Sequence, residues 1–351
     1  MQRQNRRSFI RTTAIAGIGL GLSGSISSIY AKNTVENGKR VGLIGLDTSH
    51  VVGFTRALNE QSAGSEFLGY KVVAAYPTEG SADIPASINR LEGFTEKVSK
   101  MGVEIVDSIE ALLEKVDYVL LTSVDGRRHL SEALPVIKAG KPMFVDKPFT
   151  ASLSDAIILF DKAEQYNVPI WSSSSLRYMT DAQAVARGKI GKVLGAFTYS
   201  PASIQESHPD LFWYGIHGVE ILYTVMGTGC QTVERVHTEG TDVAVGVWDD
   251  GHIGTFRGTR TGEHNYGGTA FGEKGNINLG GYEGYEPLVK EIVKSFNSQE
   301  PPVSREETLE MLAFMEAADE SKRLGGVSVK LGSIWETARK EARKKEKYMD
   351  M

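Results

Sequence analysis

The chain has 351 residues, which is too long for one ordinary domain and suits two, each able to bury its own core. Hydrophobic residues make up 41% and charged residues 24% of it, with 11 prolines, a composition that excludes wholesale disorder. The formal net charge of −5, without a dominant basic face, argues against a nucleic-acid-binding protein. A single cysteine, Cys230, excludes an intrachain disulfide.

The N-terminus has the pattern of a targeting segment. Arg6-Arg7-Ser8-Phe9-Ile10 is a twin-arginine pattern, and an apolar stretch rich in Gly, Ala and Ser follows it to residue 29. Ala31 is the expected last residue before cleavage, so residues 1–31 are predicted to be a signal that is removed on export. The alternative, an uncleaved membrane anchor, is disfavoured by the many glycines and serines. We therefore expect the twin-arginine machinery to export the folded protein to the periplasm.

Residues 38–172 alternate between short apolar runs and longer helical patterns. The predicted strands are 41–45, 71–76, 104–106, 118–121, 143–145 and 169–171. The predicted helices are 51–59, 86–101, 109–115, 130–139 and 153–166. This alternation predicts an α/β Rossmann-type, doubly wound domain with a parallel sheet.

The rhythm changes in residues 173–332, where strands occur in runs between helices. The predicted strands are 193–199, 233–237, 242–248, 253–260, 268–271 and 276–279, and the predicted helices are 181–187, 214–226, 287–296 and 305–324. Asp249-Asp250-Gly251 is a strong hairpin-turn signal. These residues predict an α+β domain with a mainly antiparallel open sheet. Residues 333–351 are predicted to form a C-terminal helical tail with a solvated, charged end.

The first strand opens into Gly45-Leu46-Asp47-Thr48-Ser49-His50, where a dinucleotide fold usually has G-x-G-x-x-G. Only Gly45 stands at an expected glycine, while Asp47 and His50 take the next two positions. The charge of Asp47 would repel a diphosphate unless the side chain turned away, for example to cap the following helix. Thr48 and Ser49 offer hydroxyl and backbone donors to a cofactor. The candidate cofactor-binding residues of this turn are Gly45, Asp47, Thr48, Ser49 and His50.

The end of the second strand should carry an acid for the ribose hydroxyls. The chain has Tyr76-Pro77-Thr78-Glu79 there, with no acid directly at the strand end and no following Arg or Lys for a 2′-phosphate. We therefore favour NAD over NADP, without excluding NADP. Thr122 and Ser123, which follow the strand at 118–121, are further candidates for cofactor contacts.

Asp146-Lys147-Pro148 comes directly after the fifth strand, at the sheet edge where open α/β sheets bind their ligands. A lysine there can donate to a substrate hydroxyl and stabilise a developing alkoxide, and the proline fixes the turn that aims it. Lys147 is therefore a candidate catalytic residue, and Asp146 a candidate cofactor contact. The alternative is a lysine in an ordinary exposed loop.

His217 is the second candidate catalytic residue. A histidine is the natural base to take a proton from a carbinol as hydride leaves. Glu220 lies three residues on, so on a helix it shares a face with His217 and is a candidate to orient it. Trp213 and Tyr214 are candidates to stack on a substrate, and Arg177 is a further candidate substrate contact. The alternative is a core histidine, and no tight ligand spacing supports a metal site.

These segments together resemble the glucose–fructose oxidoreductase, inositol dehydrogenase and MocA family, over nearly all of residues 39–331. The segments that carry the resemblance are the first strand with Gly45, Thr122-Ser123-Val124-Asp125 leading to His129, Lys138-Ala139-Gly140-Lys141-Pro142, Asp146-Lys147-Pro148-Phe149, Gly188-Lys189-Ile190-Gly191-Lys192-Val193 and Gly215-Ile216-His217. The resemblance implies nicotinamide-dependent oxidation or reduction of sugars and polyols. It also implies a homo-oligomer formed through the open sheet of the second domain. The family's catalytic lysine falls on Lys147 and its catalytic histidine on His217.

The chain departs from that family's pattern at five positions. Asp47 and His50 alter the glycine-rich turn, and Asp146 replaces the usual Glu before the lysine. The ribose acid is missing after Tyr76. Trp213 stands where the family has an Asp four residues before the histidine, which leaves His217 without that carboxylate unless Glu220 or Asp210 replaces it.

Three hypotheses follow. The leading one is an exported oxidoreductase of a sugar, glycoside or polyol hydroxyl that holds its NAD tightly, because no soluble NAD pool exists outside the cytoplasm. The second is a redox-neutral glycosidase or lyase that works through transient oxidation. The third is a non-catalytic sugar-binding descendant, supported by the altered turn and opposed by the presence of both Lys147 and His217.

Overall fold

The computed structural model describes residues 39–349 except 61–64 and 264. The predicted export signal, residues 1–31, lies outside the described residues. Within the described ranges, no helix combines the length and the apolar character needed to cross a membrane.

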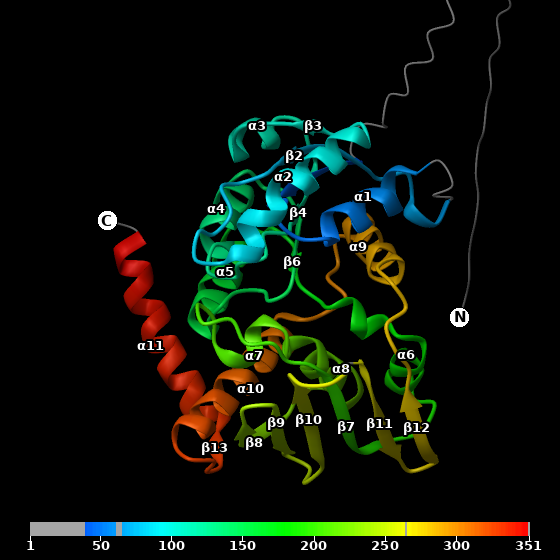
Figure 1. Ribbon diagram of the computed structural model, residues 1–351, viewed down its shortest axis with the longest axis vertical. Coiled ribbons are helices and arrows are strands. Elements are labelled where there is room, and N and C mark those ends of the chain that lie inside the picture. The colour runs from blue at the N-terminus through cyan, green and yellow to red at the C-terminus, as the bar shows by residue number, and fades with distance from the viewer. Residues whose placement is uncertain (1–38, 61–64, 264, 350–351) are drawn as a thin grey trace, which may run out of the picture. The chain divides into compact units, whose positions relative to one another are not determined.

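The N-terminal half is built on a six-stranded parallel sheet with the order β3-β2-β1-β4-β5-β6 (Figure 1). Its strands are β1 (Arg40–Ile44), β2 (Lys71–Tyr76), β3 (Glu104–Ile105), β4 (Tyr118–Leu121), β5 (Met143–Val145) and β6 (Ile170–Trp171). The order reverses direction between β1 and β4, and a sheet of this kind binds its ligands in the crevice at that point. The predicted Rossmann-type fold is confirmed.

Helices cover both faces of this sheet because neighbouring residues of each buried strand point to opposite sides. One face, with Leu43 of β1 and Leu120 of β4, packs against α1 (His50–Asn59) and α2 (Pro85–Lys100). The opposite face packs against the helices α3 (Ile109–Leu113), α4 (His129–Lys138) and α5 (Leu153–Gln165).

The C-terminal half is built on a seven-stranded sheet with the order β12-β11-β7-β10-β9-β8-β13. Its strands are β7 (Val193–Pro201), β8 (Cys230–Thr238), β9 (Thr241–Trp248), β10 (Ile253–Thr259), β11 (Gly267–Gly272), β12 (Gly275–Leu279) and β13 (Val329–Lys330). All pairs are antiparallel except β7 with β10. The hairpin predicted at Asp249-Asp250-Gly251 joins β9 to β10. The predicted mainly antiparallel sheet is confirmed.

The helices α8 (Ile216–Met226) and α10 (Arg305–Arg323) cover one face of this sheet, while the other face exposes apolar side chains. Gly218 lets α8 approach closely, because a Cβ there would come within 2.6 Å of the Phe256 ring on β10. This close contact fixes the height of the neighbouring His217 above the sheet. The short helix α6 (Thr180–Ala186) packs beside α8.

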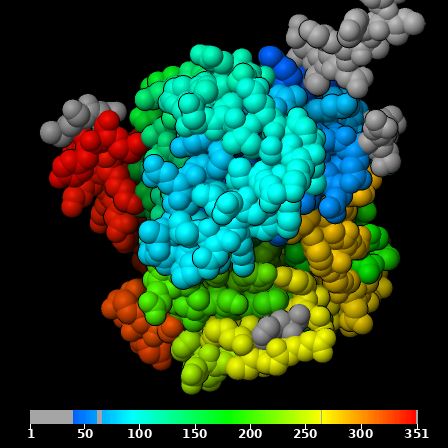
Figure 2. All heavy atoms as spheres, turned by 45° about the horizontal axis from the view of Figure 1, so that its top comes forward, coloured from blue at the N-terminus to red at the C-terminus, as the bar shows by residue number. Residues whose placement is uncertain are grey.

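Two C-terminal helices return to the first half of the chain. The helix α9 (Glu286–Ser298) packs against α1 and adds Leu288, Ile292 and Phe296 to the core of that half. In Figure 2 the orange surface of α9 adjoins the blue surface of α1. The helix α11 (Leu331–Met349) packs along α5. Sequence patterns predict the helices themselves but not these distant packing partners.

The predicted helix at 214–226 is confirmed as α8, which begins two residues later, at Ile216. The short helix α7 (Asp210–Trp213) before it was not predicted. Two 3₁₀ turns, at Ser65–Phe67 and Ser175–Tyr178, and the two-residue β13 are also absent from the predicted elements.

Candidate active site

The turn after β1 brings the chain close to the end of β4. Gly45 has a φ of +83°, and a Cβ on it would lie 2.5 Å from both the N and the Cα of Ser123. The hydroxyl of Thr122 donates to the carbonyl oxygens of Ile44 (3.0 Å) and Gly45 (2.7 Å). Ser123 Oγ donates to Glu132 (2.6 Å). The hydroxyls of Thr122 and Ser123, both predicted to contact a cofactor, are therefore engaged within the protein.

We expect Gly45→Ala to lower the stability of the folded protein. Left-handed backbone at a residue with a side chain costs about 1–3 kcal/mol, and the contact with Ser123 adds to that cost. Thermal unfolding would show a melting temperature several degrees lower. Gly102→Ala is the matched control, since Gly102 has a φ of +84° but no neighbour near its Cβ position. Equal losses in the two variants would contradict the importance of the Ser123 contact.

Asp47 turns into the protein instead of facing the cofactor side of the turn. Its carboxylate accepts hydrogen bonds from the backbone N–H of Val124 (2.9 Å) and from Ser87 Oγ (2.5 Å), and the residue is buried. The expectation that Asp47 turns away is thus met, but its suggested role as a cap of α1 is wrong. The N-cap residue of α1, Ser49, makes no side-chain cap hydrogen bond, and the N–H of His50 donates to Thr48 Oγ1 at a long 3.4 Å.

The loops after β2 and β4 are joined by a cluster of charged side chains. Asp125 accepts from Ser81 Oγ (2.6 Å) and from Arg127, and Arg127 also pairs with Asp83 (2.8 Å). His208, from the C-terminal half, reaches Asp125 at 3.2 Å. Glu79, weighed as a ribose contact, is exposed. The arginine in this cluster is paired with carboxylates, so the cluster provides no free cation for a 2′-phosphate.

Asp146 lies at the C-terminal end of β5 and is almost fully buried. One oxygen binds Nδ1 of His50 at 2.5 Å, and the other accepts the backbone N–H of Lys147 at 2.9 Å. Burial raises the pKa of Asp146, but the charges of His50 and Lys147 outweigh it and hold this pKa below its usual range. Asp146 is therefore an anion that ties the start of α1 to the lysine. The Lys147–Pro148 peptide bond is cis.

His217 lies in the first turn of α8 and faces Lys147 across one aromatic ring. The ring of Tyr214 lies 5.2 Å from that of His217, and Nζ of Lys147 lies 5.7 Å from the centre of the same tyrosine ring. Burial, then the positive charges of Lys147 and His50, lower the pKa of His217 well below its usual range. The structure thus brings the two predicted catalytic residues together and keeps the imidazole neutral near pH 7.

The partner that orients His217 is Ser174, whose Oγ lies 2.7 Å from Nδ1. When Nδ1–H donates to Ser174, the lone pair of Nε2 is left to accept a proton. Nε2 makes no hydrogen bond to any of the described residues. Ser174 follows β6, far from His217 in sequence, and the run Ser172–Ser175 carries no spacing signal that singles it out.

Neither acid proposed as a partner of His217 has that role. Glu220 pairs with Arg177 at 2.5 Å and accepts from Ser173 Oγ at 3.0 Å, so the expectation that it orients the histidine is wrong. Arg177 also pairs with Glu307 at 2.7 Å. Arg177 and Glu220, both proposed as substrate contacts, are buried partners of each other that join α8 to α10.

Asp210 helps to fix the segment that leads to His217. It pairs with Arg235 (2.8 Å) and Lys322 (2.6 Å), and its backbone N–H donates to Asp319 (3.1 Å). The fully buried Arg235 also binds Asp319 (2.5 Å) and Asp242 (2.7 Å). This network holds α7, and with it Trp213, between α10 and the second sheet.

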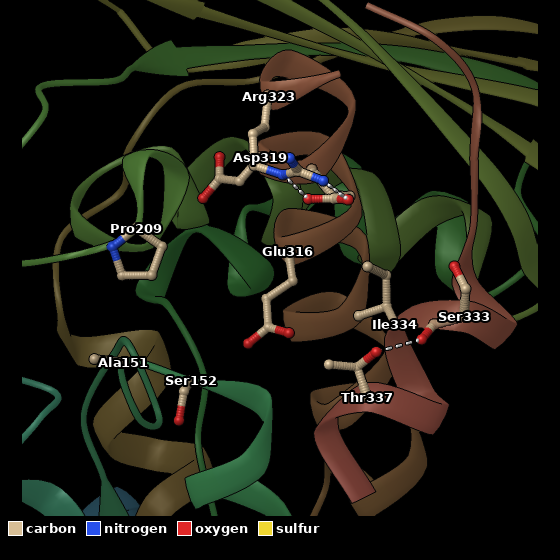
Figure 3. A pocket seen from close by; sticks show the side chains of 10 residues that line it. Ala151, Ser152, Pro209, Glu316, Asp319, Arg323, Ser333, Ile334 and Thr337 are labelled. Atoms are coloured by element: carbon tan, nitrogen blue, oxygen red, sulfur yellow. Dashed lines mark hydrogen bonds and ion pairs between the residues drawn. The ribbon is translucent and has the colours of Figure 1, made fainter. Parts of the chain in front are cut away.

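A cavity of about 500 Å³ adjoins this network, away from Lys147 and His217. Figure 3 shows Glu316 and Asp319 of α10 facing Ser152 and Pro209 across it, with Thr337 of α11 on a further side. Glu316 accepts the backbone N–H of Leu153 at 2.7 Å. Asp319 pairs with Arg235 and Glu320 pairs with Arg323, so the three acids that line this cavity have partners within the protein.

A row of four tyrosines leads from the pair of Lys147 and His217 to His50, and three of them were not predicted. Beyond Tyr214, the ring of Tyr266 lies 5.7 Å from His217, and Tyr282 and Tyr285 continue the row to His50 with centroid distances of 6.4, 5.6 and 4.7 Å. Trp213 instead packs against His208 at 5.0 Å. The three tyrosines come from loops after β10 and β12, where the sequence shows no periodic pattern.

The fold and the site define a Rossmann-type protein with a lysine and a histidine at the edge of its first sheet. Residues 39–174 match the family described as an oxidoreductase family with an NAD-binding Rossmann fold. The match covers the Rossmann-type half of the chain and ends shortly after β6. No curated protein matches the chain.

Solved structures with the same fold cover most of the chain at low sequence identity. A probable dehydrogenase from Thermotoga maritima is 22% identical, with a TM-score of 0.69, over 84% of this chain and 99% of its own. Scyllo-inositol dehydrogenase from Lactobacillus casei, with bound NAD(H) and scyllo-inositol, is 17% identical (TM-score 0.65; 84% and 99%). Myo-inositol dehydrogenase from the same organism, with NAD(H) and myo-inositol, is 17% identical (TM-score 0.66; 83% and 96%).

The turn after β1 fits the diphosphate of a dinucleotide. Ser49 makes no side-chain cap at the start of α1, Gly45 leaves the backbone free to approach, and the carboxylate of Asp47 is turned inward. The backbone donors of Thr48 and Ser49 stand at that helix start, where an anion is favoured. The predicted cofactor class agrees with the NAD-binding description of the family.

Proposed function

We propose that this protein is an NAD-dependent oxidoreductase that acts on a hydroxyl of a sugar, glycoside or polyol. The observation that supports it most directly is the meeting of Lys147 with a buried, neutral His217 around the ring of Tyr214. This pair lies beside a turn whose residues fit a dinucleotide.

Each residue of the pair has a distinct role. Lys147 Nζ donates to the substrate oxygen and stabilises negative charge as that oxygen loses its proton. His217 Nε2 accepts the proton, and Ser174 keeps the imidazole in the tautomer that can accept it. The bound nicotinamide supplies the hydride acceptor. NADP is not excluded, although the end of β2 carries no free arginine or lysine for its phosphate.

The tyrosines around the pair support a carbohydrate substrate. The rings of Tyr214 and Tyr266 both contact the imidazole of His217. A tyrosine ring can pack against the apolar face of a sugar while the tyrosine hydroxyl binds a polar group. Inositol, the ligand in two of the similar structures, is a polyol of the same kind. Tyr282, between Tyr266 and Tyr285 in the row, is 45% exposed.

The decisive experiment is mass spectrometry of the small molecules carried by natively purified protein, followed by turnover assays on a panel of sugars, glycosides and polyols. We expect tightly held NAD or NADH and a change in nicotinamide absorbance with one class of substrate. Released aglycone without net absorbance change would point to the redox-neutral reaction instead. Absence of nicotinamide, and of any binding on titration, would favour the non-catalytic hypothesis.

Export by the twin-arginine route is part of the proposal. Arg6→Lys with Arg7→Lys should leave the protein in the cytoplasm, while the unchanged chain should be found in the periplasm without its first 31 residues. Fractionation and N-terminal sequencing measure both outcomes. An unchanged chain that stays cytoplasmic would contradict it.

The exposed face of the second sheet suits a homo-oligomer. Ile253 on β10 and Val247 on β9 are paired neighbours, 53% and 38% exposed, and Phe197 and Phe271 extend the apolar patch. We expect Ile253→Asp to convert the oligomer to a monomer in light scattering after size exclusion. Ile88→Asp, at an exposed position on α2, is the matched control. A monomeric unchanged protein would contradict this interface.

A further inference from the structure

Two of the departures from the family pattern contact each other. His50 stands at the third glycine position of the turn, and Asp146 stands where the family has a Glu before its lysine. Ninety-six residues separate them, yet Nδ1 of His50 lies 2.5 Å from Oδ2 of Asp146. Side-chain exposure is 13% for His50 and 4% for Asp146, so water screens this pair little.

The contact continues to the backbone of the lysine. Oδ1 of Asp146 accepts the N–H of Lys147 at 2.9 Å, and the N–H of Asp146 donates to the carbonyl of Leu121 at 2.8 Å. One carboxylate therefore joins the first residue of α1, on the cofactor turn, to the residue that carries the catalytic ammonium.

Aromatic rings fix the other sides of the His50 imidazole. Tyr285 lies 4.7 Å from it and Phe54 lies 5.6 Å from it, both as ring centroid distances. The hydroxyl of Tyr285 also lies 3.4 Å from Ser49 Oγ. The imidazole thus contacts two aromatic rings besides the carboxylate of Asp146.

We propose that His50 is a positioning residue for Lys147, which it holds through Asp146 against the turn that binds the cofactor. The proposal rests on the role of Lys147 given under Proposed function. Asp146 is shorter than the family's Glu, and His50 is larger than the family's Gly, so the two changes together keep a contact between the turn and the lysine. In this proposal the altered turn is part of the active site and still binds the cofactor.

The activity test compares two substitutions of the same histidine. His50→Ala removes the partner of Asp146, and we expect kcat to fall by about ten- to a hundredfold while KM for the sugar changes little. His50→Asn places an amide N–H near the position of Nδ1 and should recover most of the loss. His252→Asn is the matched control, because His252 pairs with Asp250 at 2.9 Å in the exposed β9–β10 turn.

A second readout does not depend on turnover. The rate at which an amine-reactive acyl reagent labels Lys147, followed by peptide mass spectrometry, should change several-fold in His50→Ala. It should stay near the unchanged value in His50→Asn, and labelling of the exposed Lys192 should be equal in all variants. If labelling of Lys147 is unaffected by His50→Ala, the proposal is wrong. If no substrate is ever found, this measurement still decides it.

The pH profile separates positioning from general damage to the fold. The groups that face His217 are Lys147, Ser174, Tyr214 and Tyr266, and His50 acts on it at longer range. Replacing the positive charge of His50 by the neutral Asn removes a repulsion, so the pKa of His217 should rise and the acid limb of kcat should move to higher pH. Loss of activity without this movement would overturn the link between position 50 and the catalytic pair.

Discussion

Lys147→Met is expected to lower kcat by about a thousandfold, within the range that a positioned proton donor supplies. Methionine keeps the length and apolar body of the side chain but removes the ammonium that lies 5.7 Å from the centre of the Tyr214 ring. Binding of NAD to the turn after β1 should persist, because that turn offers backbone donors that do not depend on Lys147. Steady-state kinetics and NAD titration measure the two effects separately.

Lys141→Met is the matched control for this substitution. Lys141 precedes β5 while Lys147 follows it, and its Nζ donates to the carbonyl of Val116 at 2.9 Å, away from His217. We expect its kcat to stay within about threefold of the unchanged value, as for a surface substitution away from the chemistry. Similar losses in the two variants would mean that the lysine acts through stability and not through the substrate.

Loss of the ammonium should also be visible at His217. The charge of Lys147 is one cause of the lowered pKa of this histidine, so Lys147→Met should raise that pKa toward its usual range. A titration of the imidazole by NMR would measure the change without any turnover. No movement would place Lys147 farther from His217 than their shared contact with Tyr214 indicates.

The fold was predictable because its signals are local. β2 and β4 are apolar runs of four to six residues bounded by loops, and the structure begins and ends them at the predicted residues, 71–76 and 118–121. The packing of α9 on α1 was not predictable in this way. Its apolar face, with Leu288 and Ile292, shows that the helix is half-buried but not which surface it covers.

The same contrast between local signals and long-range contacts applies to the residues of the candidate site. Lys147 and His217 were found because a strand end and a helix start are visible in the sequence. The pairing of Ser174 with His217 and that of His50 with Asp146 were not predicted, because hydrogen-bond partners 43 and 96 residues apart leave no periodic trace. Glu220 was predicted to orient His217 on helical spacing alone, but it forms an ion pair with the buried Arg177 instead.

His50 and Asp47 show why two departures from one motif need separate explanations. Each side chain replaces a glycine, but Asp47 turns inward to the backbone of Val124, whereas His50 turns sideways to Asp146. The carboxylate of Asp47 and the imidazole of His50 are thus both engaged by partners within the protein. A motif compared letter by letter loses this information, because the direction of a side chain depends on its partner.

His217→Asn is expected to lower kcat by about a hundred- to ten-thousandfold and to remove the acid limb of the pH profile. In the unchanged enzyme the base must be unprotonated, and its lowered pKa keeps it so until the pH falls well below 6.5. Activity should therefore stay level through neutral pH and decline only in acid. Asparagine can still bind Ser174 but has no group that accepts the proton. His237→Asn, at an exposed strand end paired with Asp242, is the control.

The same titration links pH to folding stability. Below pH 6.5 an unfolded chain binds a proton at this histidine while the folded chain does not, so the free energy of unfolding falls as the pH drops through that window. Removing the imidazole removes this contribution. Urea unfolding at several pH values should thus show a smaller acid-induced loss of stability for His217→Asn than for the unchanged protein. An equal loss in both would mean that His217 is less buried than its contacts with Ser174 and Tyr214 require, and the case for a neutral base would fail with it.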